Sequence, residues 1–231
     1  MFRKKKKTNS KIRHLITKLN PRSPISEQYR TIRTNLQFAS IDKELRSILI
    51  TSAAPSEGKS MTTANLAVVY AQQGKKVLLI DADLRNPTVH YTLRLDNLSG
   101  LSTILVGEDR LSEAIQDSSI ENLSVLSSGP NPPNPSELLA SSRMKQVLAE
   151  AKQYYDLIII DSPPVLPVTD AQILANLVDG SLLVIRSRQT EYESAEKAIE
   201  ALERSTSKIL GTVLNDRDKK DSNSYYYYHS Y

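Results

Sequence analysis

Short, almost continuous runs of Val, Ile and Leu recur along the chain, and longer amphipathic stretches separate them. Such runs are typical of strands covered on both faces, because neither face then carries polar side chains. The predicted strands are 47–52, 76–81, 123–127, 157–161, 181–186 and 209–215. The predicted helices are 59–73, 135–154, 169–177 and 191–205. This alternation predicts the α/β fold class, with a parallel β-sheet flanked by helices on both faces.

The length of 231 residues suits one α/β domain with short extensions. We predict a flexible basic leader at 1–23, a folded domain at 24–215 and a tyrosine-rich tail at 216–231. The domain is expected to open with a helix at 26–40, because the hydroxyl of Ser26 could accept a hydrogen bond from a free amide at the start of the helix.

Basic residues are concentrated at the beginning of the chain. Residues 1–33 contain eleven Lys/Arg and a single acidic residue, Glu27, so within the net charge of +4 this segment carries +10 and the remainder −6. A basic segment on an acidic body either binds anionic lipid, nucleic acid or an acidic partner, or remains a solvated arm. The composition leaves these alternatives open.

The composition excludes several classes of protein. The chain has no cysteine, which excludes a disulfide framework and a cysteine-based metal site. No run approaches the roughly 18 apolar residues that a membrane-spanning helix needs. The basic start is not followed by the apolar stretch of a signal peptide. We therefore expect a cytoplasmic protein.

A segment rich in small residues joins the strand predicted at 47–52 to the helix predicted at 59–73. It reads Ala53-Ala54-Pro55-Ser56-Glu57-Gly58-Lys59-Ser60, the arrangement of a phosphate-binding P-loop with Ala in place of the usual first Gly. Its amides and the positive end of the next helix suit phosphate. Lys59 is expected to reach the β- and γ-phosphates, and Ser60 to ligate Mg²⁺. Gly58 is expected because a Cβ would crowd the phosphates. The residues expected at the nucleotide are Ala53, Ala54, Pro55, Ser56, Glu57, Gly58, Lys59, Ser60 and Met61.

Two further predicted strands end in carboxylates. Asp81 ends one strand, with Asp83 two residues later, and Asp161 ends another. Because ligands of open α/β sheets bind beyond the carboxyl ends of the strands, these acids and the P-loop are expected to meet at one edge. Mg²⁺ prefers oxygen ligands, so Asp161 suits the metal-binding role known as Walker B.

The second acidic strand end bears on the type of reaction. One Walker B carboxylate suffices for nucleotide hydrolysis, whereas Asp81 adds a group that could accept a proton from an incoming hydroxyl or hold Mg²⁺. A phenol has a pKa of about 10, so positioning contributes more than the base itself. Arg85 either stabilises phosphate charge or is a surface arginine on the following turn.

The P-loop, the segment Ile-Asp-Ala-Asp-Leu-Arg at 80–85 and the segment Asp-Ser-Pro-Pro at 161–164 together resemble the bacterial tyrosine kinases (BY-kinases) of capsule and exopolysaccharide loci. The resemblance covers residues 24–231. It implies a P-loop NTPase fold of the MinD/ParA type, also called deviant Walker, with ATP and Mg²⁺ as cofactors. Ser56 departs from the family, which often has Gly at that position.

The resemblance also implies roles for individual residues. The catalytic residues would be Lys59, Asp81, Asp83 and Arg85. The metal ligands would be Ser60, Asp83 and Asp161. Asn215 resembles the position that contacts adenine in related ATPases.

A pattern of one acid and two arginines, Glu27, Arg30 and Arg33, matches the E-x-x-R-x-x-R motif by which the family joins subunits into a ring. The three side chains lie three residues apart and share one face of the predicted helix. They are therefore expected to form a subunit contact, in which the arginines bind carboxylates of a neighbour. The alternative is a stripe of ion pairs within the helix.

The tail holds five of the eleven tyrosines in the last seven residues of the chain. Such a cluster is either a substrate or an unreactive aromatic segment; the resemblance implies autophosphorylation of Tyr225, Tyr226, Tyr227, Tyr228 and Tyr231. The nine residues after Asn215 could span about 30 Å, which allows the tail to reach its own site or a neighbour's. We expect transfer between subunits.

Each phosphate adds about −1.5 to −2 charges, so we also expect phosphorylation to release the tail and loosen the ring.

The resemblance implies partners as well. We expect a ring-like homo-oligomer, a separate membrane-anchored modulator that recruits the kinase to the inner face of the membrane, and a phosphotyrosine phosphatase. Protein substrates could include enzymes of polysaccharide biosynthesis, and no nucleic acid is expected.

Two other functions remain open beside a kinase. One is a regulatory ATPase of the MinD/ParA type, whose signature lysine would fall at Ala54; a dimer built on that lysine is therefore not expected here. The other is a scaffold with a vestigial nucleotide site, which the occupied catalytic positions disfavour.

Overall fold

The computed structural model describes residues 14–39 and 44–218. Within these residues the chain forms one seven-stranded sheet with the order β3-β4-β2-β5-β1-β6-β7. The strands are β1 (Ser47–Ser52), β2 (Val77–Asp81), β3 (Ile115–Asp117), β4 (Leu123–Leu126), β5 (Leu157–Asp161), β6 (Gly180–Arg186) and β7 (Lys208–Asn215). Neighbouring strands are parallel except for β3, which is antiparallel to β4. The predicted α/β fold with a mainly parallel sheet is confirmed.

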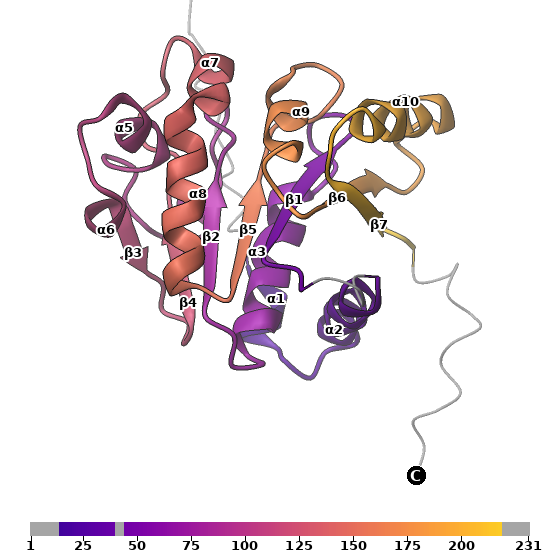
Figure 1. The fold of residues 1–231 in the computed structure, drawn as a ribbon. Coiled ribbons are helices and arrows are strands. Elements are labelled where there is room, and N and C mark those ends of the chain that lie inside the picture. Colours follow the sequence, from indigo (N-terminus) through magenta and orange to yellow (C-terminus); the bar gives the residue numbers. More distant parts are fainter. Residues whose placement is uncertain (1–13, 40–43, 219–231) are drawn as a thin grey trace, which may run out of the picture.

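Helices cover both faces of this sheet (Figure 1). They are α1 (Ile16–Leu19), α2 (Pro24–Phe38), α3 (Lys59–Ala71), α4 (Val89–Leu93), α5 (Leu101–Val106), α6 (Leu111–Ala114), α7 (Pro135–Ala140), α8 (Ser142–Tyr154), α9 (Asp170–Ala175) and α10 (Tyr192–Glu203). One hydrophobic core lies between the sheet and the face formed by α1–α4. The second lies between the sheet and α5–α10.

The central strands contribute to both cores. In β5, Ile158 and Ile160 pack into one core, whereas Leu157 and Ile159 pack into the other. Alternate side chains of a strand point to opposite faces, so a strand between two helical layers needs apolar residues at every position. This explains the continuous apolar runs of the sequence.

The start of the first long helix differs from the prediction. Ser23, not Ser26, is the N-cap of α2: its hydroxyl accepts a hydrogen bond from the amide of Ser26 at 3.1 Å, and Pro24 follows at the first helical position. Proline suits that position because its missing amide would have no partner there. The hydroxyl of Ser26 instead donates to the carbonyl of Asn20 at 2.8 Å.

One predicted helix has a break in the structure, and three short helices and one strand between β2 and α7 were missed. The predicted helix at 135–154 is two helices, α7 and α8, because the chain is extended at Ser141, which caps α8 with its side chain. The short elements α4, α5, α6 and β3 had not been predicted. Each has six residues or fewer, too few for a periodic pattern to stand out.

The end of the predicted flexible leader is folded. Leu15 and Thr17 are buried, and Thr17 donates to Asn65 Oδ1 on α3 through its amide at 3.1 Å and its hydroxyl at 2.8 Å. Gln72 Nε2 donates to the carbonyl of Thr17 at 3.0 Å. The prediction of a flexible leader is therefore wrong for this part. Residues 1–13 lie outside the described residues, as do the tail tyrosines.

None of the helices in the described ranges has the length and apolar character needed to cross a membrane.

Candidate active site

The P-loop runs from the end of β1 to the start of α3 and takes two left-handed backbone conformations. Gly58 has φ 91° and Ser56 has φ 68°. A non-glycine residue at positive φ carries a steric cost, so Ser56 occupies a backbone conformation that favours glycine. A Cβ on Gly58 would lie 2.0 Å from Asn215 Nδ2. The loop itself therefore requires glycine at 58, in addition to any crowding of phosphate.

The side chains of Glu57 and Asn215 hold this loop in place, and no sequence pattern indicated that these two residues interact. Glu57 is 1% exposed, and its carboxylate accepts from the amide of Ala54 at 2.9 Å and from the hydroxyl of Thr190. Asn215 Nδ2 donates to the carbonyl of Glu57 at 2.9 Å. Asn215 thus contacts the loop, and its contact with a nucleotide remains a prediction. No local pattern marks Thr190, because only the fold brings it to the loop.

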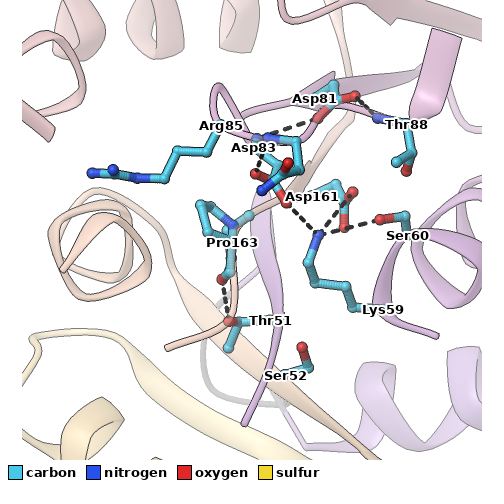
Figure 2. Close-up of polar contacts among 12 residues, drawn as sticks. Thr51, Ser52, Lys59, Ser60, Asp81, Asp83, Arg85, Thr88, Asp161 and Pro163 are labelled. Atoms are coloured by element: carbon cyan, nitrogen blue, oxygen red, sulfur yellow. Dashed lines mark hydrogen bonds and ion pairs between the residues drawn. The ribbon is translucent and has the colours of Figure 1, made fainter. Parts of the chain in front are cut away.

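The acids at the strand ends converge on Lys59 (Figure 2). Lys59 Nζ lies 3.0 Å from Asp83 Oδ2, 3.5 Å from Asp161 Oδ2 and 3.2 Å from Ser60 Oγ. The strands β2 and β5 are adjacent and in register, with Asp81 opposite Asp161. The expectation that the P-loop and the acidic strand ends meet at one edge is confirmed.

Burial and mutual repulsion govern the charges of this cluster. Burial and, next, the nearby Asp161 carboxylate raise the pKa of Asp81 to about 7, although the hydrogen bond from the amide of Val89 opposes this. Burial likewise raises the pKa of Asp161, although the Lys59 ammonium opposes this. Burial alone would lower the pKa of Lys59, but Asp161 and Asp83 raise it above its ordinary value. Lys59 is therefore held charged among the acids.

Asp81 lies deeper than its predicted catalytic role suggests. It is fully buried, and its carboxylate accepts from three backbone amides, those of Asp83 at 3.2 Å, Thr88 at 3.0 Å and Val89 at 3.0 Å. The cavity beside the P-loop has a volume of about 610 Å³ and is lined by Lys59, Ser60 and Asp83 but not by Asp81. Asp81 thus organises the turn that presents Asp83.

The residues expected to hold Mg²⁺ fit a magnesium ion chemically. The Ser60 hydroxyl and the carboxylates of Asp83 and Asp161 meet at one cation, the Lys59 ammonium, and all three supply the hard oxygen ligands that Mg²⁺ prefers. The described residues contain no cluster of three acidic, His or Cys side chains placed to hold a metal alone.

Thr63, which the sequence did not single out, orients one of these acids. Its hydroxyl lies 3.1 Å from Asp161 Oδ1 and 2.8 Å from the carbonyl of Lys59. The position one helical turn after Lys59 faces the same side of α3, which is the signal that could have identified it.

Arg85 does not join the other predicted catalytic side chains. It extends away from Lys59 (Figure 2) and binds Asp170 through Nε at 2.9 Å and Nη2 at 3.1 Å. Its Nη2 also donates to the hydroxyl of Ser136 at 2.9 Å. The side chain of Asp170 is fully buried. In this structure Arg85 connects the turn after β2 to α7 and α9.

The three residues of the predicted subunit contact all lie on α2 and make contacts within the chain. Arg30 pairs with Glu27 one turn earlier, and Arg33 Nη1 donates to the carbonyl of Val69 near the end of α3 at 2.9 Å. The ion pair within the helix, which was the alternative interpretation, is therefore present. Contacts with a neighbour remain a prediction.

The fold and site together define a class of protein. The sheet is mainly parallel, and a P-loop follows its internal strand β1. A lysine and a serine open the next helix, and carboxylates lie at the ends of two neighbouring strands. These are the features of a P-loop nucleoside-triphosphate-binding protein.

Comparison with known proteins narrows this class. The family described as AAA domain matches residues 45–215. The tyrosine-protein kinase YwqD of Bacillus subtilis (strain 168) is 55% identical over 216 residues, which cover 94% of this chain and 91% of YwqD. The crystal structure of the chimerical protein CapA2B2 has a TM-score of 0.86 at 44% identity and covers 89% of this chain and 90% of that one. The kinase domain of the Escherichia coli tyrosine kinase ETK has a TM-score of 0.84 at 39% identity, with coverage of 87% and 79%.

This chain belongs to the bacterial protein-tyrosine kinases. The resemblance stated from the sequence motifs is thus confirmed, as is the assignment of the chain as an enzyme of that type. The MinD protein of Pyrococcus horikoshii, solved with Mg-ADP, shares the fold at a TM-score of 0.64 and 27% identity, covering 76% of this chain and 72% of MinD. The MinD-like fold is therefore confirmed as well.

Proposed function

We propose that the chain transfers the γ-phosphoryl group of Mg-ATP to tyrosines, including Tyr225, Tyr226, Tyr227, Tyr228 and Tyr231 of its own tail. The observation that carries this proposal is that Lys59, Ser60 and Asp83 line one cavity. The buried carboxylate of Asp161 pairs with Lys59, and Asp81 is buried behind Asp83. A single Walker B acid would suffice for hydrolysis; the additional acids of β2 suit transfer to an alcohol.

Nucleotide binding would rest on the P-loop and on Lys59. Loop amides and the N-terminus of α3 supply positive charge for the phosphates. Lys59 would exchange Asp83 and Asp161 for phosphate oxygens, which releases both carboxylates. When bound, Mg²⁺ would neutralise phosphate charge, held by Ser60 directly and by Asp83 and Asp161 directly or through water.

Transfer forms a bond between the phenol oxygen and the γ-phosphorus and breaks the bond from that phosphorus to ADP. The phenol must also lose its proton, and we assign its uptake to the acid pair Asp81 and Asp83. Asp83 lines the cavity and would face the acceptor. Asp81, whose pKa is raised to about 7, is the member that holds a proton near neutral pH. Arg85 would act by positioning this turn through Asp170.

The tail would be phosphorylated between subunits of a ring-like oligomer joined through Glu27, Arg30 and Arg33. The name CapA2B2 describes a chimera of two components, which supports a separate membrane-anchored modulator as partner. We propose that this modulator recruits the kinase to the inner face of the membrane, where it regulates capsule or exopolysaccharide synthesis, and that a phosphotyrosine phosphatase reverses the reaction.

A mixing experiment tests the proposal. A Lys59→Met chain, which supplies a tail but no active site, is incubated with Mg-ATP and an active chain truncated after residue 218. Phosphosite mapping should find phosphotyrosine on the tail of the Lys59→Met chain. Truncated chains that also carry Asp81→Ala should leave it unlabelled. The experiment is repeated with a candidate modulator, and an unlabelled tail in both conditions would refute transfer between subunits.

The alternative is a regulatory ATPase, which the likeness to MinD supports. In that case the same mixture releases inorganic phosphate without forming phosphotyrosine. Ala54, at the position of the signature lysine, argues against a dimer of the MinD/ParA type.

A further inference from the structure

One arginine side chain at the end of β6 connects the P-loop to the start of the predicted tyrosine-rich tail. Arg186 Nε and Nη2 donate to the carboxylate of Asp216 at 2.9 and 2.7 Å. The remaining nitrogen of this guanidinium, Nη1, donates to the carbonyl of Ser56 at 3.3 Å. Arg186 therefore joins the first residue after β7 to the loop that would bind phosphate.

The sheet brings these residues together from distant parts of the sequence. The strands β6 and β7 lie side by side (Figure 1), with Arg186 opposite Asn215. Asn215 binds the carbonyl of Glu57 directly at 2.9 Å. The next residue, Asp216, reaches the preceding carbonyl, that of Ser56, through Arg186. Two consecutive residues at the end of the sheet therefore restrain two consecutive carbonyls of the P-loop.

The backbone of Ser56 needs such a restraint. Its φ of 68° lies in the left-handed region, where a Cβ carries a steric cost. A residue keeps such a conformation only when the surrounding structure holds it there. Ser56 is exposed, whereas the next residue, Glu57, is buried and bonded to Ala54 and Thr190. The contact with Arg186 therefore acts on the part of the loop that the core does not hold.

We propose that the Arg186–Asp216 pair positions the P-loop and thereby raises its affinity for nucleotide. Arg186 would hold the carbonyl of Ser56 so that the loop amides stay directed at the phosphates, and Asp216 would hold the guanidinium in place. A loop that is ordered before binding loses less entropy when the ligand arrives. The proposal rests on the proposed nucleotide site and adds the first residue of the tail to that site.

The alternative is an exposed ion pair without a role. The side chains of Arg186 and Asp216 are 37% and 59% accessible, and exposed pairs contribute little to stability. Loss of a positioning contact lowers nucleotide affinity, whereas loss of a pair without a role changes nothing. The backbone amide of Arg186 donates to Thr190 Oγ1 at 2.8 Å. A side-chain variant keeps this bond, so it leaves the contact between Thr190 and Glu57 undisturbed.

The test is titration of the full chain with a fluorescent, non-hydrolysable ATP analogue in the presence of Mg²⁺. Arg186→Ala and Asp216→Ala should each weaken binding by about fivefold, the lower end of typical coupling between sites. The double variant should bind no more weakly than Arg186→Ala, because both side chains act through the contact with Ser56. In tail phosphorylation, Arg186→Ala should raise the KM for ATP and keep the kcat.

The charge of Asp216 separates positioning from simple electrostatics. ATP is an anion, so removal of a nearby negative charge would strengthen its binding if charge alone mattered. The positioning role predicts the opposite result, weaker binding in Asp216→Ala.

The matched control is Lys197→Ala. It removes one positive charge, as Arg186→Ala does, but from the exposed pair that Lys197 forms with Glu193 within α10. It should bind the analogue as the wild-type chain does, and urea unfolding verifies that every variant is folded. Unchanged affinity in Arg186→Ala, tighter binding in Asp216→Ala or an equal loss in Lys197→Ala would overturn the proposal. A wild-type chain that binds no analogue would refute the proposed nucleotide site itself.

Discussion

Gly58 shows how a single residue of the site is constrained from several sides. It precedes α3 in a left-handed conformation with φ 91°, and a Cβ there would collide with Asn215 Nδ2. Asn215 in turn holds the carbonyl of Glu57. A side chain at 58 would therefore disturb both the P-loop and the end of β7.

Replacing this glycine should impair both the fold and the site. For Gly58→Ala we expect a loss of roughly 1–2 kcal/mol from the positive φ alone, and ATP affinity reduced by at least about tenfold, or 1.4 kcal/mol, because Asn215 is displaced. Urea unfolding and titration with a fluorescent ATP analogue measure the two effects. The control is Gly74→Ala, which has φ 90° but nothing within 4 Å of its Cβ. It should lose stability and keep its affinity; equal affinity losses in both variants would contradict the explanation.

The raised pKa of Asp81 predicts how stability depends on pH. The unfolded state has the ordinary value of 3.8 and the folded state about 7, so the folded state binds the proton more tightly. The contribution to stability is complete below pH 3.8. It falls by about 1.4 kcal/mol per pH unit as the pH rises between these values and is lost above pH 7.

Asp81→Asn removes this dependence. Between pH 5 and pH 7 the unfolding free energy of the wild-type chain should fall by roughly 2 kcal/mol more than that of the variant. Asp161, whose pKa is also raised, repels Asp81, so the difference between the two chains reports Asp81 together with its coupling to Asp161. Urea unfolding at a series of pH values provides the measurement. Parallel curves for the two chains would show that Asp81 is ionised in the folded state throughout.

At the scale of the elements, the turn after β2 is fixed from both ends. Asp81 holds the amides at the start of α4, and Arg85 binds Asp170 at the start of α9. The Asp170 side chain is buried and Arg85 shields it from water. Asp83, which lies between these two anchors, is thereby presented to the cavity. The turn that carries Asp83 therefore depends on the packing of α7 and α9 as well as on its own sequence.

Breaking this anchor should destabilise the fold. Arg85→Ala leaves the carboxylate of Asp170 buried with Ser136 as its remaining side-chain partner, and we expect a loss of about 3 kcal/mol. Adding Asp170→Asn should recover part of it, because the unpaired charge is removed. Both variants are compared by urea unfolding and by tail phosphorylation.

This pair of variants also separates the two roles of Arg85. If Arg85 only positions the turn, the double variant regains both stability and kinase activity. If Arg85 contacts phosphate, stability recovers and activity does not, which would contradict the positioning role.

At the scale of the whole molecule, α2 packs onto α3, and its exposed side chains would form the proposed contact with a neighbour. Glu27 and Arg30 are partly exposed, with 64% and 28% of their side chains accessible. Arg33 holds the end of α3 through the carbonyl of Val69. Within one chain, Arg30 therefore forms an exposed ion pair, whereas Arg33 binds a backbone carbonyl of α3.

Separate substitutions of Arg30 and Arg33 should distinguish the contributions of these two side chains to stability and to the subunit contact. Arg30→Ala should change chain stability by less than about 1 kcal/mol, since exposed ion pairs contribute little, and should lower the mass of the oligomer. Arg33→Ala should cost about 1–2 kcal/mol, because a buried carbonyl loses its donor, and should lower the mass as well. Urea unfolding and light scattering across concentrations measure both. An unchanged mass in both variants would refute the subunit contact.

Much of the fold could be predicted because its signals are local. The six predicted strands all occur with ends within one residue of those observed, since strands between two helical layers are apolar throughout. The short elements between β2 and α7 were missed because tertiary packing, rather than periodicity, stabilises them. The docking of Leu15 and Thr17 was missed because it depends on Asn65, 48 residues away from Thr17.

The sequence by itself determined the chemistry of this protein: a P-loop, acids at two strand ends and, through their combination, the tyrosine-kinase family. These signals lie within short segments whose backbone conformation the segments themselves favour. Only the tertiary structure decided where these side chains lie. Asp83 lines the cavity, Asp81 is buried behind it, and Arg85 points away and binds Asp170. Orientation, burial and pKa depend on neighbours that are distant in the chain, and the fold alone brings those neighbours together.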